Sequence, residues 1–195
     1  MLTVFLDFKS PASFLALEPT LALARDTGVQ IDWRPFSVRP LSIPAEKADE
    51  TVGERHRRVR AIARRDTHLH YAAVQGRDMH FSDKPAGSDA ALAALTTIEG
   101  DPVPYMRAAF EAYWTGQTDL DDEAVVTALL SAQGIAPPDW NAAHAQLVSI
   151  RTRAEETGIF ESPSYHIADQ LFVGREHLPW IRSLIAETRL ENRGL

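Results

Sequence analysis

The sequence predicts an α/β fold in which a βαβ unit and a closing ββα unit are separated by a large all-helical insertion. Three observations support this. Apolar residues alternate over residues 2–8 and again over 29–36, and a helical repeat lies between these two runs. From about residue 40 to residue 158 the apolar residues recur at helical spacing. After Gly158 the pattern returns to short strands and one last helix.

The first unit is a strand, a helix and a second strand. Ser10 and Pro11 supply an N-cap and a first-turn proline, and Gly28 ends the helical repeat that follows them. Pro19 lies inside this helix and removes one backbone hydrogen bond, so we expect a bend there. Because such a unit joins its strands by a helical crossover, the second strand should lie parallel to the first.

The insertion and the closing unit complete the chain. Breaks at glycines and prolines divide the insertion into helices near residues 51–75, 86–98, 102–115, 121–133 and 138–157. Two strands then flank Ala168-Asp169-Gln170 as a tight hairpin, and a helix follows over 176–189. This order predicts a thioredoxin-like domain formed by residues 1–39 and 158–195, with an inserted helical domain over 40–157.

Composition excludes several kinds of function. The 195-residue chain has a net charge of -7 and no cysteine, which argues against nucleic-acid binding and excludes thiolate nucleophiles, disulfides and zinc–thiolate sites. We see no secretion signal and no run of about 20 apolar residues, so we expect a cytoplasmic protein without a membrane span. The basic segment 55–65 is either a solvated helix face or an anion-binding surface.

Two loops carry a serine followed by a proline: Ser10-Pro11 and Ser162-Pro163. In the predicted topology, the loop after the first strand and the turn before the third strand meet at one edge of the sheet. A proline that enters a strand is best tolerated in a tight turn with a cis peptide bond. We therefore predict that Ser162-Pro163 is cis and faces Ser10.

The segments "DFKSPASFLA" and "GIFESPSYHIADQLFVGREHL" resemble the 2-hydroxychromene-2-carboxylate isomerases and kappa-class glutathione transferases, which belong to the DsbA superfamily. The resemblance implies a DsbA-like fold, a homodimer and a glutathione site. It assigns the catalytic hydroxyl to Ser10, which would donate a hydrogen bond to the glutathione sulfur. The alternative is that Ser10 is only a helix N-cap, and the two roles can coexist.

The resemblance also implies the residues that hold glutathione: Ser10, Pro11, Ser162, Pro163, Arg175 and Glu176. Ser162 would pair through its backbone with the cysteinyl part, in the manner of an added strand. Relatives commonly carry Gly-Asn-Asp where this chain has Gly174-Arg175-Glu176. Glu176 can pair with the γ-glutamyl ammonium, whereas Arg175 departs from the family pattern.

Other residues have weaker assignments. Ser13 and Trp114 are candidates for the substrate cleft, although a small helix residue and a core residue are the alternatives. We expect Asp119 to cap the helix that starts near Asp121. Arg39, Arg58 and Arg65 are available cations for the glycine end of glutathione. His68 and His70 face different ways on a helix, so we expect no metal site.

The leading hypothesis is an enzyme that uses the glutathione thiolate on a small electrophilic, aromatic substrate. An isomerase would release glutathione unchanged, and a transferase would release the adduct; both need the same thiolate site. The alternative, from another class, is a thioredoxin-like binding protein that has lost redox thiols and catalysis.

Overall fold

The computed structural model describes residues 1–81, 84–85 and 87–191. Its elements, in chain order, are β1 (Leu2–Leu6), α1 (Pro11–Thr27), β2 (Ile31–Pro35), α2 (Val52–Val74), α3 (Asp89–Leu95), α4 (Val103–Thr115), α5 (Glu123–Ala132), α6 (Trp140–Glu156), β3 (Ser164–Ile167), β4 (Gln170–Val173), the 3₁₀ turn η1 (Arg175–His177) and α7 (Leu178–Glu191). Residue 86 of the predicted third helix and residues 192–195 lie outside the described part. Within the described part, no helix is long and apolar enough to span a bilayer.

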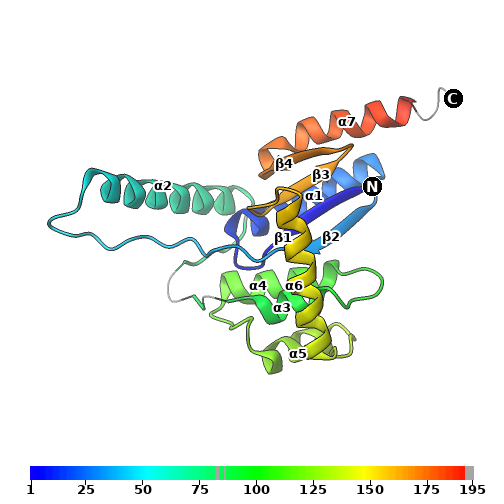
Figure 1. The fold of residues 1–195 in the computed structure, drawn as a ribbon, viewed down its shortest axis with the longest axis horizontal. Coiled ribbons are helices and arrows are strands. Elements are labelled where there is room, and N and C mark those ends of the chain that lie inside the picture. Colours follow the sequence, from blue (N-terminus) through cyan, green and yellow to red (C-terminus); the bar gives the residue numbers. More distant parts are fainter. Residues whose placement is uncertain (82–83, 86, 192–195) are drawn as a thin grey trace.

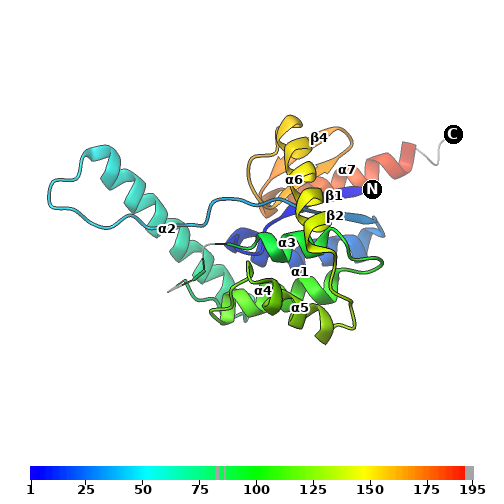
Figure 2. The same cartoon turned by 60° about the horizontal axis from the view of Figure 1, so that its bottom comes forward.

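The strands form one mixed sheet in the order β2-β1-β3-β4 (Figure 1). β1 and β2 are parallel, as predicted from the crossover, and β3 is antiparallel to both β1 and β4. One face of β1, made of Leu2, Val4 and Leu6, is buried. Helices α1 and α7 lie along the sheet, while α3, α4 and α5 gather together (Figure 2) and share one buried core with β1 and α1.

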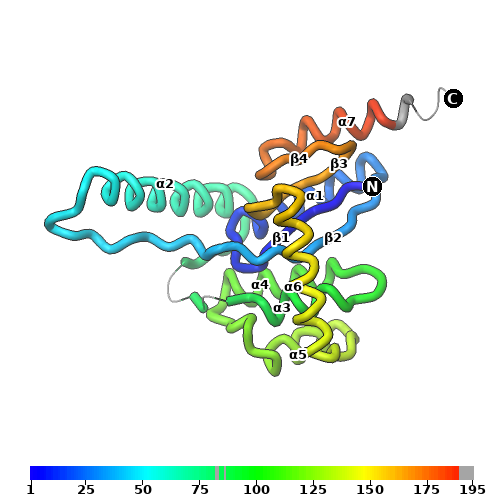
Figure 3. The backbone as a smooth tube through the Cα atoms, in the orientation of Figure 1, coloured from blue at the N-terminus to red at the C-terminus, as the bar shows by residue number. Residues whose placement is uncertain are grey.

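Helix α2 projects away from the rest of the molecule, alongside the extended segment that follows β2 (Figures 1 and 3). Its N-terminus is closed by a capping box between Thr51 and Glu54. On this 23-residue helix the buried residues are Ala61 and Ala72. Because so little of α2 is buried in the protein, most of its charged side chains are available to a cavity or to solvent.

The structure corrects three local predictions. Asp122, not Asp119, caps α5, because the Asp122 carboxylate accepts from the Ala124 and Val125 N–H groups; Asp119 accepts from the Asp121 N–H instead. The hairpin turn contains only Ala168 and Asp169, both with positive φ, so Gln170 belongs to β4.

The third correction concerns the last helix. The last helix is preceded by a 3₁₀ turn over Arg175–His177 and begins at Leu178 rather than at Glu176. Helix α1 is one continuous helix that includes Pro19.

Candidate functional site

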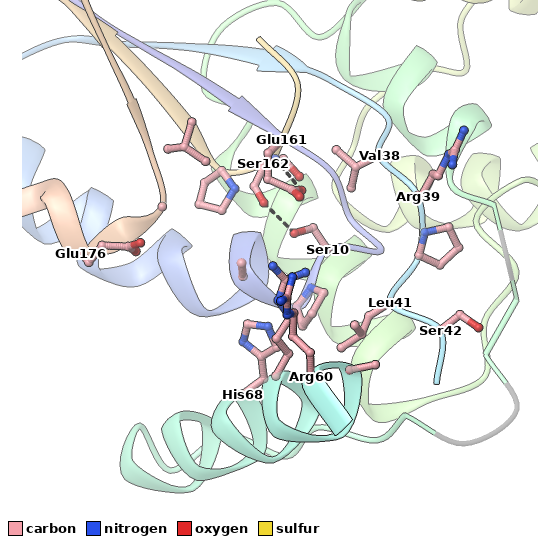
Figure 4. Close-up of a pocket in the computed structure, with 18 of the residues that line it drawn as sticks. Ser10, Val38, Arg39, Leu41, Ser42, Arg60, His68, Glu161, Ser162 and Glu176 are labelled. Carbon is pink, nitrogen blue, oxygen red and sulfur yellow. Dashed lines mark hydrogen bonds between the residues drawn. The ribbon is translucent and has the colours of Figure 1, made fainter. Parts of the chain in front are cut away.

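The two Ser-Pro loops meet, as the sequence predicts. The Ser10 hydroxyl donates to the Ser162 carbonyl oxygen over 2.9 Å, and the Ser162-Pro163 peptide is cis (Figure 4). Ser10 is 4% exposed and Ser162 is 1% exposed. Residues separated by 152 positions therefore form a buried contact at the N-terminus of α1.

Ser10 is also the N-cap of α1. Its backbone is extended, and its Oγ accepts a hydrogen bond from the Ser13 N–H over 3.2 Å. The hydroxyl has one proton, and here that proton is directed at the Ser162 carbonyl. For Ser10 to donate to a ligand, another group has to replace it at that carbonyl.

A cavity of about 700 Å³ opens beside this contact. It brings together most of the residues predicted to hold glutathione: Ser10, Pro11, Ser162, Pro163 and Glu176. The walls come from the start of α1, the loop before β3, the extended segment after β2 and one side of α2 (Figure 4). A cavity of this size is typical of small-molecule sites.

Both hydrogen-bonding groups of the Ser162 backbone have internal partners. The Ser162 N–H donates to the Glu161 carboxylate over 3.0 Å, and the carbonyl accepts from Ser10. The Ser162 side chain differs, because its Oγ is buried and has no hydrogen-bond partner among the described residues. A buried hydroxyl without a partner costs about 1–3 kcal/mol, so this group destabilises the free protein.

We expect Ser162→Ala to stabilise the free protein by about 1 kcal/mol, because it removes a buried hydroxyl that has no partner. The same variant should bind glutathione less tightly if Oγ contacts the ligand. Urea denaturation measures the first effect and calorimetry the second. Ser164→Ala is the matched control: this buried Oγ donates to the Glu161 carbonyl over 2.7 Å, so its loss should destabilise the protein. Destabilisation by both variants would show that Ser162 Oγ is satisfied in the free protein.

Three arginines that the sequence analysis did not single out line the cavity. Arg57, Arg60 and Arg64 stand at i, i+3 and i+7 on α2, so they share one face of the helix. Arg60 extends toward Ser10, together with His68 from the same helix (Figure 4). The helical spacing of arginines within the basic segment 55–65 could have predicted a shared face, but it did not show that this face lines the cavity.

The arginines named in the sequence analysis are placed differently. Arg58 pairs with Glu50 at 2.6 Å and Arg65 pairs with Asp66 at 2.8 Å, and neither lines the cavity. Arg39 lines it, but its guanidinium points away from Ser10 (Figure 4).

Arg175 and Glu176, which follow β4, have different surroundings, because only Glu176 lines the main cavity. The Arg175 guanidinium lies over the Tyr71 ring, 4.3 Å from its centroid, and lines a second cavity of about 620 Å³. Glu176 lines both cavities. Gly174 has a φ of 93°, and a Cβ there would collide with the Glu176 carboxylate, so glycine lets that carboxylate lie over the backbone.

Ser13 and Trp114 do not line the main cavity, so we assign them to the interior rather than to the substrate cleft. The Ser13 side chain is buried beside a small internal space near β1. Trp114 packs against Phe14 and Tyr113, and its Nε1 donates to the Phe8 carbonyl over 3.0 Å. An indole that is buried and hydrogen-bonded in this way is a core residue.

A buried ion pair lies next to Ser10 in the chain. Lys9 Nζ is 2.7 Å from the Asp7 carboxylate, and both side chains are nearly inaccessible. Asp7 also accepts from the Ser88 hydroxyl and the Val38 N–H, and its carbonyl accepts from the Ser10 N–H. Burial raises the pKa of Asp7, against the lowering effects of Lys9, Ser88 and Val38.

His68 stands where the two cavities meet. Burial lowers its pKa, and the nearby charges of Arg175 and Arg64 lower it further. Its imidazole is therefore expected to be neutral at pH 7. Within the described residues, no group of three or more His, Cys, Asp or Glu side chains could hold a metal ion.

Comparison with known proteins supports the fold. A family model described as a DSBA-like thioredoxin domain matches residues 1–186. The 2-hydroxychromene-2-carboxylate isomerase of Sphingobium xenophagum is 25% identical over 190 residues, which cover 94% of this chain and 96% of that protein. A solved 2-hydroxychromene-2-carboxylate isomerase structure superposes with a TM-score of 0.78 at 18% identity, covering 99% of this chain and 98% of that one.

A more distant structure was solved with GSH. The cytosolic disulfide reductase DsbM from Pseudomonas aeruginosa superposes with a TM-score of 0.63 at 16% identity, covering 97% of this chain and 98% of that one. These likenesses confirm the predicted fold, thioredoxin-like with a helical insertion.

Proposed function

The chain belongs to the family of DsbA-like thioredoxin domains, and from this premise we propose that it is a glutathione-dependent isomerase. A kappa-like glutathione transferase would use the same site. Similarity to a 2-hydroxychromene-2-carboxylate isomerase over nearly the whole chain supports an enzyme of the isomerase kind. Unlike a disulfide reductase, the chain has no cysteine with which to exchange disulfides.

The observation that carries this proposal is the contact between the Ser10 hydroxyl and the Ser162 carbonyl. A ligand that pairs with the Ser162 backbone, as an added strand would, presents an N–H to that carbonyl. This N–H would replace the Ser10 hydroxyl, which is then able to turn toward the ligand sulfur. The same ligand would displace the Glu161 carboxylate from the Ser162 N–H.

The residues around the cavity fit glutathione. Glu176 offers a carboxylate to the γ-glutamyl ammonium, and the arginines of α2 that line the cavity offer a guanidinium to the glycyl carboxylate. Bound glutathione would supply a thiolate that adds reversibly to an electrophilic carbon of the substrate.

The chain contributes to this chemistry by favouring the thiolate. Ser10 would donate a hydrogen bond to the sulfur, and the positive end of the α1 dipole lies at the same place. Arg60 and Arg64 add positive charge along the cavity wall. The apolar side chains of Pro11, Val38 and Pro163 would limit access of water to the reacting sulfur.

Glutathione binding is the direct test. At a concentration one hundred times its Kd, glutathione should stabilise the protein against unfolding by about 2.7 kcal/mol. Denaturation with and without glutathione measures this effect, and S-methylglutathione shows how much of it needs the thiol. No stabilisation at millimolar glutathione would favour the alternative, a binding protein that holds a peptide beside Pro163.

A further inference from the structure

The three cavity-facing arginines of α2 have no described carboxylate partner. Arg57, Arg60 and Arg64 form no ion pair with a carboxylate of residues 1–81, 84–85 or 87–188, whose side chains are described. Three other arginines of the same helix differ, because Arg55 and Arg58 pair with Glu50 and Arg65 pairs with Asp66. The helix therefore directs its uncompensated positive charge toward the cavity that contains Ser10.

This arrangement has an electrostatic cost in the free protein. Like charges three and four residues apart on a helix repel one another, and the chain has an excess of acidic residues that could have paired with them. A bound anion would relieve the repulsion. The spacing from Arg57 to Arg64 corresponds to about 10 Å along the helix, so the charge is spread along the cavity and not gathered at one point.

Glutathione alone does not account for all three arginines; this step rests on the proposed function. In glutathione, the ammonium and the carboxylate of the γ-glutamyl part are attached to the same carbon atom. If Glu176 holds the ammonium, this carboxylate must also lie near Glu176. The second cavity contains Glu176 and His68 but none of the three arginines, which places Glu176 at the His68 end of the row. Only the glycyl carboxylate is left for the arginines, and one guanidinium can bind it in a bidentate manner.

We propose that the glycyl carboxylate of glutathione takes one arginine of the row Arg57, Arg60 and Arg64, that the other two bind the co-substrate, and that this electrophile carries at least two negative charges. The facing wall includes Val38, Pro40 and Leu41, so the substrate combines an apolar body with acidic groups. Carboxylates and phosphate esters share the chemistry that guanidinium groups recognise.

The test compares two double variants of the complete chain. Arg60→Gln with Arg64→Gln removes two charges that face the cavity. Arg55→Gln with Arg65→Gln removes two charges from the same helix that already have carboxylate partners. Calorimetry at constant ionic strength would use succinate and pyrophosphate as dianionic or more highly charged probes, and acetate as the monoanion, each with and without saturating glutathione.

We expect succinate, pyrophosphate or both to bind the unmodified protein more tightly than acetate does. This preference should persist when glutathione is present. The succinate and pyrophosphate arms distinguish a carboxylate site from a phosphate site. The cavity-facing variant should lose about tenfold or more in affinity, and the control should stay within about twofold. Equal losses in the two variants would overturn the proposal.

The glutathione arm separates this proposal from the proposed function. If glutathione binds and abolishes succinate and pyrophosphate binding, the arginines serve glutathione and the co-substrate proposal is wrong, while the proposed function stands. If glutathione does not bind at all, the proposed function is wrong, whatever the probes show.

Discussion

Ser10→Gly is expected to fold normally and to lose glutathione-dependent turnover by about 10²-fold or more. Glycine caps a helix nearly as well as serine, so the loss of stability should be only a few tenths of a kcal/mol. The hydroxyl, in contrast, lies at the start of α1 beside Ser162, where it is placed to donate to a ligand sulfur. Removing one preorganised donor to a reacting anion typically lowers the rate by two to three orders of magnitude.

The pKa of the bound thiol distinguishes the two roles of Ser10. Without the hydroxyl, thiolate absorbance of bound glutathione should titrate at higher pH than in the unmodified protein. Ser10→Ala should lose the same activity and, in addition, about 1 kcal/mol of stability, because alanine cannot cap. Full turnover in Ser10→Gly with an unchanged thiol pKa would leave Ser10 as a helix cap alone.

Lys9→Met is expected to destabilise the protein by about 3–5 kcal/mol, because it leaves the buried Asp7 carboxylate without its counter-charge. Lys9 Nζ also donates to the hydroxyls of Ser37 and Ser88, so the substitution disrupts hydrogen bonds to two other segments. Urea denaturation at pH 7 measures the loss. A loss below about 1 kcal/mol would show that the pair is solvated.

An exposed ion pair of the same length provides the control. Arg107 Nε lies 2.7 Å from Glu18, but the two side chains are 53% and 46% exposed. Arg107→Met should therefore cost no more than about 1 kcal/mol. The double variant Asp7→Asn with Lys9→Met should lose less than the sum of its single variants, since each single variant leaves one buried charge without its partner.

The Lys9→Met variant should also respond to pH. Burial already raises the pKa of Asp7, and removing Lys9 removes the largest effect that opposes burial. The native state then binds a proton more readily than the unfolded chain, so stability falls as pH rises from about 4 through the native pKa. The deficit of the variant is therefore expected to be smaller at pH 4 than at pH 7.

The order of elements and the meeting of the two Ser-Pro loops were predictable from the sequence. Helical spacing ends at Gly28 and strand spacing returns after Gly158, and these are local properties of the chain. Once β1 and β3 are neighbours in one sheet, the loops at their ends have to meet, which brings Ser10 to Ser162. The lack of cysteine excluded thiol exchange without any structure.

The placement of single side chains was less predictable. The family resemblance makes Trp114 a cleft candidate, and Ser13 is one because it lies one turn beyond Ser10, but the surroundings of both come from α1, β1 and other distant segments. Asp119 and Asp122 are both suitable caps by type, and the structure uses Asp122 for α5 because its carboxylate reaches the first N–H groups.

The sequence by itself determined which residues could take part: a serine at the start of a helix, a proline entering a strand and an arginine-rich helix. Only the tertiary structure decided which arginines matter. Which face of α2 is turned toward the protein depends on which of its residues are buried, and the buried residues are Ala61 and Ala72. Burial of Asp7 with Lys9 likewise depends on Ser37, Val38 and Ser88, which folding brings from distant parts of the chain.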